Sequence, residues 1–145
     1  MSDLVASALQ ITTGGARAVL AAAAREAQAG PSPVSIAVVD SGGHLLALER
    51  LPGAAPHTVH SATTKAACAA SMRKETGLAR APIDIPTGLG IALAAGPSRW
   101  TPLPGGFPLL VDGQCVGAIG VAGAPHEADE RIARAGAAAL ADVDT

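Results

Sequence analysis

The stretch from Leu103 to Gly123 constrains the fold more than any other part of the sequence. Two apolar runs, Phe107 to Val111 and Cys115 to Val121, flank the dipeptide Asp112-Gly113. A two-residue hairpin turn needs positive φ at both central positions, and an Asp-Gly dipeptide meets that need. We therefore predict a central β-hairpin.

The second strand of this hairpin places Gly117, Gly120 and Gly123 where side chains would otherwise stand. Glycine inside a strand marks a bulge or a close approach to the backbone. The approaching group is either another segment of the chain or a ligand. In the simplest alternative, the glycines only let a helix pack on the sheet.

Length and composition predict one domain over residues 1–145 with a core built from small side chains. The sequence has 145 residues, 49% of them hydrophobic. Trp100 and Phe107 are its only aromatic residues. Alanine and glycine bury little area each, so we expect a homo-oligomer that buries further surface.

Charge and hydropathy exclude two classes of partner. The formal net charge is −2, which with so few aromatics leaves neither a basic surface nor a stacking surface for nucleic acid. The longest apolar run, residues 18–24, is too short to span a bilayer. The N-terminus lacks a basic leader region, so we expect a cytoplasmic protein. Cys68 and Cys115 have neither a metal-ligand nor a disulfide-framework spacing, and we expect no metal site.

The order of elements predicts an α+β domain with antiparallel strand pairs and helices packed over one sheet. Thr12 or Thr13 is expected to cap the first helix, and Thr58 the second. Residues 75–99 are rich in proline and glycine and should form an irregular connection with at most one helical turn. The predicted elements are helix 16–29, strands 34–40 and 44–50, helix 60–73, the hairpin strands 107–111 and 115–121, and a last helix that begins near Pro125.

The start of the second helix carries the most suggestive polar residues. His57 and His60 flank Thr58, and a helix N-terminus offers unpaired N–H groups to an anion. The two imidazoles could add donors, a base or an iron ligand, or they could be exposed histidines without a role. Lys65, further along this helix, is either a carboxylate or phosphate anchor or an ordinary solvated lysine.

Further candidates lie near predicted turns. His44 follows a Gly-Gly turn and is either a partly exposed strand residue or a ligand. Glu49 and Arg50 end the second strand, where they line a pocket or form an ion pair. Gly105 and Gly106 expose consecutive backbone N–H groups that could form an anion nest.

Several segments together resemble the GlcG/HbpS family, also called the haem-degrading domain family. The segments that carry the resemblance are 35–50, 62–66, 104–108 and 111–121, together with Asp129-Glu130. The family pattern is matched by Asp40, Arg50, Lys65, Asp129 and most of the turn and strand glycines. The resemblance implies a profilin-like α/β fold, with a five-stranded antiparallel sheet and helices on both faces. It also implies assembly of between two and eight copies, and binding of haem or another tetrapyrrole.

The sequence departs from the family pattern in three places. His60 stands where the family commonly has an acidic residue. Arg50 is followed by Leu-Pro-Gly instead of Met-Asp-Gly, and the aromatic residue usual after the lysine helix is missing near Ser71. A histidine in place of an acid changes what can bind at the start of the second helix.

Two main functional hypotheses remain. The first is a small-molecule-binding protein, with haem as the candidate ligand and His57, His60 or His44 as iron ligands. The second is a cofactor-independent isomerase, cyclase or lyase that acts on a small anionic substrate. A structural or chaperone-like oligomer is the third alternative.

The enzyme hypothesis assigns a role to each polar candidate. His60 or His57 would move a proton, with Glu49 or Glu75 as the reserve acid or base. Lys65 and Arg50 would hold a carboxylate. The substrate would also contact Thr58, Gly120, and the Gly105 and Gly106 amides, which would stabilise oxyanion charge.

Overall fold

A computed structural model describes residues 3–77 and 83–141 of the chain. Within these ranges the chain forms four helices and four strands. The helices are α1 (Thr13–Gln28), α2 (His57–Met72), α3 (Ile85–Ala95) and α4 (His126–Ala141), and the strands are β1 (Ser35–Asp40), β2 (Leu45–Arg50), β3 (Gly106–Val111) and β4 (Gln114–Ala122).

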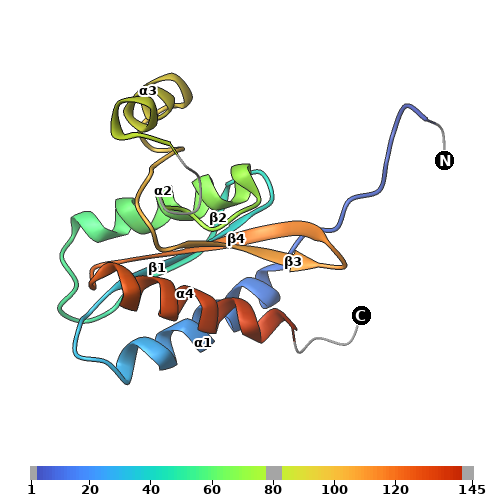
Figure 1. Cartoon of the computed structure of the whole chain (residues 1–145). Coiled ribbons are helices and arrows are strands. Elements are labelled where there is room, and N and C mark those ends of the chain that lie inside the picture. The colour runs from blue at the N-terminus through green and yellow to red at the C-terminus, as the bar shows by residue number, and fades with distance from the viewer. Residues whose placement is uncertain (1–2, 78–82, 142–145) are drawn as a thin grey trace.

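The strands form one antiparallel sheet in the order β2-β1-β4-β3. Helix α2 covers one face of the sheet, and α1 and α4 cover the other (Figure 1). The predicted α+β fold with helices on both faces of an antiparallel sheet is therefore confirmed. The family resemblance implies a fifth strand, and this expectation is wrong, because the sheet of the described residues has four strands.

The predicted hairpin is present as β3 and β4. Its two turn residues, Asp112 and Gly113, have φ values of 51° and 77°. Both values lie in the left-handed region that a two-residue hairpin turn requires. The Asp-Gly signal therefore located the hairpin correctly, but its central position is only partly confirmed, because β4 is an inner strand and β3 lies at the edge of the sheet.

The strand glycines allow other parts of the chain to approach β4. A Cβ atom on Gly120 would collide with the backbone carbonyl of Ala62 in α2 and would lie 2.6 Å from the Ala66 nitrogen. At Gly117 a Cβ would collide with the Val39 carbonyl of β1. The group that approaches these two glycines is thus the chain itself, which is one of the alternatives that the sequence left open.

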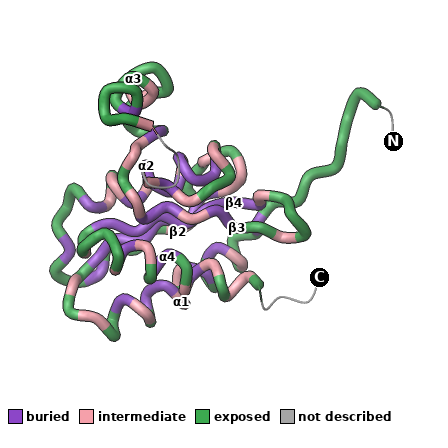
Figure 2. Tube along the Cα trace, viewed as in Figure 1, coloured by how far each residue is buried: buried purple, intermediate pink, exposed green. Residues whose placement is uncertain are grey.

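The two faces of the sheet carry different cores. Between the sheet and α2 the buried apolar cluster consists of Val39 and seven alanines: Ala37, Ala62, Ala66, Ala69, Ala70, Ala118 and Ala122. The core towards α1 and α4 contains larger residues such as Val19, Ile36, Ile119 and Ile132. Figure 2 shows the buried residues concentrated along the sheet and on the inner sides of the three helices that cover it. Short side chains let α2 lie very close to the strands.

The first helix agrees with its prediction, whereas the start of the second does not. The Thr12 side chain caps α1 by accepting a hydrogen bond from Gly15 N at 3.0 Å. Helix α2 begins at His57, and Pro56 occupies its N-cap position without a side-chain hydrogen bond. Thr58 therefore lies inside the helix, and its predicted capping role is wrong.

The connection between α2 and β3 is more regular than predicted. Its helix α3 has 11 residues, and Asp84 caps it by accepting a hydrogen bond from Thr87 N at 2.8 Å. The expectation of a single helical turn is wrong, because the Asp84 cap and Pro86 in the first turn start a helix that two glycines do not break. Residues 78–82 of the predicted irregular segment lie outside the described residues.

Helix α3 stands beyond α2, on the side away from the sheet (Figure 1). Its residues Ile85, Leu89 and Leu93 are mostly exposed. In the described part of the chain, no helix has the combination of length and apolar character that crossing a bilayer requires.

Candidate functional site

Lys65 lies on the side of α2 that faces the sheet, where it is 4% exposed. Its Nζ atom donates to the backbone carbonyl of Val121 at 2.9 Å and to Asp129 Oδ2 at 3.2 Å. The other oxygen of Asp129 accepts a hydrogen bond from Ala124 N at 3.0 Å. One buried ion pair thus joins α2, the end of β4 and the first turn of α4.

This ion pair is closed to solvent, since Asp129 is 1% exposed. Burial raises the pKa of the Asp129 carboxyl, while the Lys65 charge and the bond from Ala124 N oppose that rise. A buried charge must keep its partner. Lys65 therefore has an internal partner in place of the open anion site that the sequence suggested.

Gly105, Gly106 and Gly120, which the sequence predicted as substrate-binding residues, also lie where other parts of the chain pack closely against the backbone. Gly106 N donates to Thr76 Oγ1 at 2.9 Å, so this N–H group is already used. A Cβ atom on Gly105 would lie 2.6 Å from the carbonyl oxygen of Val121. Gly120 lies beneath α2, as described above. The structure does not assemble an open nest of N–H groups at residues 105 and 106.

Two adjoining cavities lie along a different side of α2. The first, here called the polar cavity, has a volume of about 300 Å³ and lies between α2, the β1–β2 turn and the segment after α3. Residues that line it include Gly43, His44, His60, Thr63, Thr64 and Arg99. The second, here called the apolar cavity, has a volume of about 380 Å³ and lies between α2, α3 and the segment after α3. Residues that line it include His60, Thr64, Leu89, Pro97, Trp100 and Leu103.

His60 and Thr64 line both cavities. They are four residues apart in α2 and therefore lie one above the other on the same side of the helix. Thr64 is 4% exposed, and its hydroxyl has no hydrogen-bond partner among the described residues. A buried polar group without a partner costs about 1–3 kcal/mol. The wall shared by the two cavities thus holds an imidazole and a hydroxyl that a ligand could satisfy.

The β1–β2 turn brings His44 to the rim of the polar cavity. Asp40 Oδ1 accepts hydrogen bonds from Gly42 N at 2.9 Å and His44 N at 3.0 Å, and it lies 3.3 Å from His44 Nδ1. Slight burial raises the pKa of the Asp40 carboxyl, but these hydrogen bonds and the nearby imidazole together lower it. Asp40 therefore holds the turn in the shape that places His44 opposite α2.

The structure brings together some of the predicted residues and separates others. His44 and His60 line one cavity. His57 is exposed at the first position of α2 and lines neither cavity. Glu49 and Arg50 are exposed at the end of the edge strand β2 and also lie outside both cavities.

Sequence reasoning missed most residues of the cavity walls, and three of them carry the chemistry discussed below: Thr64, Arg99 and Trp100. Thr64 carries a usable signal, because it follows His60 at helical spacing. Arg99 and Trp100 carry none, since they reach the site only through the path of the connection that contains α3.

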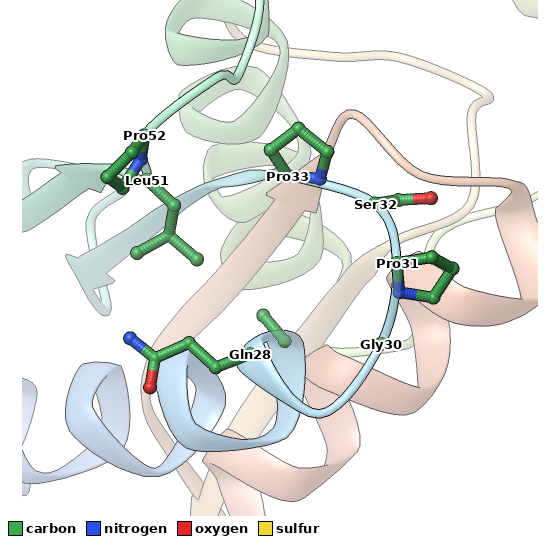
Figure 3. Close-up of a pocket in the computed structure, with 8 residues that line it drawn as sticks. Gln28, Gly30, Pro31, Ser32, Pro33, Leu51 and Pro52 are labelled. Atoms are coloured by element: carbon green, nitrogen blue, oxygen red, sulfur yellow. The ribbon is translucent and has the colours of Figure 1, made fainter.

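A third cavity, near the end of α1, offers less chemistry. It has a volume of about 270 Å³ and is lined by Pro31, Pro33, Leu51 and Pro52, with the Gln28 and Ser32 side chains nearby (Figure 3). None of its lining residues has an ionisable side chain. Within residues 3–77 and 83–141, no group of three or more histidine, cysteine or acidic side chains could hold a metal ion.

Comparison with known proteins identifies relatives over most of the chain. Over 106 residues the chain is 42% identical to protein GlcG of Escherichia coli K12, an alignment that covers 73% of this chain and 76% of GlcG. A crystal structure of a double mutant of HbpS from Streptomyces reticuli superposes with a TM-score of 0.79 and 36% identity, covering 97% of this chain and 93% of HbpS.

A crystal structure of the PduOC:Heme complex superposes with a TM-score of 0.80 and 26% identity, covering 90% of this chain and 95% of PduOC. The family model described as haem degrading protein HbpS-like matches residues 11–138. These matches confirm the resemblance seen in the sequence motifs. The chain belongs to the HbpS-like family.

Proposed function

We propose that this protein binds haem or a related tetrapyrrole in the two joined cavities beside α2, with His60 as the iron ligand. The observation that carries the proposal is the wall shared by the cavities, where the His60 imidazole and the unpartnered Thr64 hydroxyl lie between an apolar and a polar space. The PduOC structure, which contains haem, adds support from a relative.

The residues present fit a haem group. Imidazole is a common axial ligand of haem iron, and His60 is exposed to an incoming ligand. The apolar cavity offers Trp100, Leu89 and Pro97 as a surface for a porphyrin ring. The Thr64 hydroxyl would gain a hydrogen-bond partner, which it lacks among residues 3–77 and 83–141.

Each part of the site has its own role in binding. His60 would hold the iron, the residues around Trp100 would shield one side of the ring from water, and Thr64 would orient a polar group beside the iron. When bound, haem supplies an iron centre that can change its oxidation state.

The residues predicted for a cofactor-independent enzyme do not gather at one site, in contrast to the residues that line the two joined cavities. Lys65 is paired with Asp129, Gly106 N is bonded to Thr76, and Glu49 and Arg50 lie outside both cavities. Of that set, His60 alone lines the candidate site. Haem binding therefore has the better support.

A titration with ferric haem, followed in the Soret region, tests the proposal. The wild type is compared with His60→Ala and with the matched control His57→Ala, which removes an exposed histidine from the same helix. Competing albumin removes haem that is only adsorbed to the surface. We expect saturable, stoichiometric binding in the wild type and in His57→Ala, and loss of the saturable Soret shift in His60→Ala. Equal binding by the two variants would contradict the assignment of His60.

A further inference from the structure

We infer that Arg99, together with His44, forms a carboxylate-binding subsite in the polar cavity, so that the joined cavities select ligands with a flat apolar body and a carboxylate arm. The position of the subsite rests on the proposed function, since it assumes that the joined cavities are the ligand site. The class of ligand is wider, because it does not require iron or a tetrapyrrole.

The charges around the polar cavity favour an anion. Arg99 contributes a permanent positive charge, and His44 and His60 add imidazole donors. Among the residues that the structure describes, no acidic one lines the cavity; Asp40 lies just outside it, against His44. The planar guanidinium of arginine matches the two oxygens of a carboxylate.

The apolar cavity determines the other end of the ligand. It adjoins the polar cavity at His60 and Thr64, and its walls include Leu89, Trp100 and Leu103. An aromatic ring held there would direct a short acidic arm past Thr64 towards Arg99. An apolar compartment beside a cationic one is the arrangement that an amphipathic aromatic acid fills.

The test uses two probes of nearly the same shape, 1-naphthoate and the neutral 1-naphthalenemethanol, whose affinities are measured by calorimetry at pH 7. Trp100 is the only tryptophan of the chain, so its single indole N–H signal in NMR reports whether the probe enters the apolar cavity. We expect the wild type to prefer naphthoate by about fivefold or more, as an arginine–carboxylate pair at a partly open site provides. We also expect naphthoate to shift the Trp100 signal.

Variants of Arg99 test whether this residue causes the preference for naphthoate over the neutral alcohol. Arg99→Gln should abolish the preference for naphthoate, and Arg99→Lys should keep part of it because the charge remains without the planar fork. Arg25→Gln, which removes an exposed arginine of α1, is the matched control and should behave as the wild type. The inference is overturned if the wild type shows no preference, if the preference survives Arg99→Gln, or if the Trp100 signal does not move.

Haem and its dimethyl ester, in which the propionate carboxylates are blocked, separate the two proposals. Binding of naphthoate through Arg99 without binding of haem would retain the subsite and reject the proposed function. Equal binding of haem and its dimethyl ester, with no preference for naphthoate, would retain haem binding and reject the subsite.

Discussion

Polar residues on two sides of helix α2 differ in whether the fold gives them hydrogen-bond partners. On the side that faces the sheet, Lys65 is buried and bonded to both Val121 and Asp129. On the side that faces the cavities, Thr64 is equally buried but its hydroxyl has no partner within the described ranges, and His60 is exposed. Lys65 and Thr64 are adjacent in the sequence but lie on different sides of α2, so the segments that pack against each side decide which of them is paired.

From this difference we expect residues on the side that faces the sheet to contribute to stability, and residues on the side that faces the cavities to contribute to ligand binding. The side that faces the sheet is packed through glycine and alanine and closed by the ion pair of Lys65 and Asp129. The other side borders the two cavities and carries the Thr64 hydroxyl, which has no partner among the described residues, so the candidate site lies there. A buried polar group that the fold leaves without a partner calls for an explanation, and we propose a bound ligand as the explanation for Thr64.

Breaking the ion pair should produce the largest effect. We expect Asp129→Ala to lower the free energy of unfolding by about 3–5 kcal/mol, because it leaves the Lys65 charge buried without a partner. Urea denaturation measures this change. Replacing both partners in Lys65→Met/Asp129→Leu should recover part of the loss. A loss below about 1 kcal/mol in Asp129→Ala would show that water reaches Lys65.

Removing hydroxyl groups from α2 should have a smaller effect that depends on the position. Thr58 donates to the Ala55 carbonyl at 2.6 Å and shares a hydrogen bond of 2.8 Å with Ser35 Oγ. Thr58→Val should therefore cost about 1–3 kcal/mol. Thr64→Val removes a hydroxyl that has no partner in the described part of the chain, so it should leave the free energy of unfolding of the unliganded protein unchanged or slightly higher.

The two threonine variants are controls for each other, since both replace a buried, β-branched residue in one helix by an isosteric one. Urea denaturation of the unliganded protein gives both values. Equal losses in the two variants would mean that the Thr64 hydroxyl has a partner, and the distinction between the two sides of α2 would fail.

The turn that carries His44 should give the smallest effect, and it depends on pH. Since the pKa of Asp40 is lowered in the folded state, its contribution is present above the pKa of the unfolded chain and is lost as the pH falls through the folded pKa. At pH 7 we expect Asp40→Asn to be less stable than the wild type by less than about 1 kcal/mol. Thermal unfolding from pH 7 down to pH 2.5 should show this gap closing. A gap that stays constant with pH would contradict the assignment.

Local patterns were sufficient for much of the fold. The Asp112-Gly113 turn and the Thr12 cap each depend on residues close in the sequence: the turn was predicted correctly, and Thr12 was one of the two caps predicted, with Thr13 as the alternative. Thr58 was misassigned because its hydroxyl finds Ser35, a partner from β1 that local sequence cannot reveal. Helix α3 was missed because its glycines and proline outweighed the capping signal of Asp84.

Only part of the candidate site could be predicted from the sequence. His60 was identified from its position near the start of a helix, whereas Lys65 looked equally suitable as a ligand-binding residue. The ion pair with Asp129 depends on α4 packing against the end of β4, which no local pattern encodes. Arg99 became part of the site through the fold alone. The two sides of α2 are distinguished by the burial and hydrogen-bond pairing of their polar groups, and residue type alone does not reveal this.

One paired measurement tests the separation of stability and binding most directly: the free energy of unfolding without ligand and the affinity for haem, for both His60→Ala and Thr58→Val. We predict that His60→Ala loses haem binding and keeps the stability of the wild type, whereas Thr58→Val loses about 1–3 kcal/mol of stability and binds haem as the wild type does. If both variants change both quantities together, the two sides of α2 are not independent and the account is contradicted.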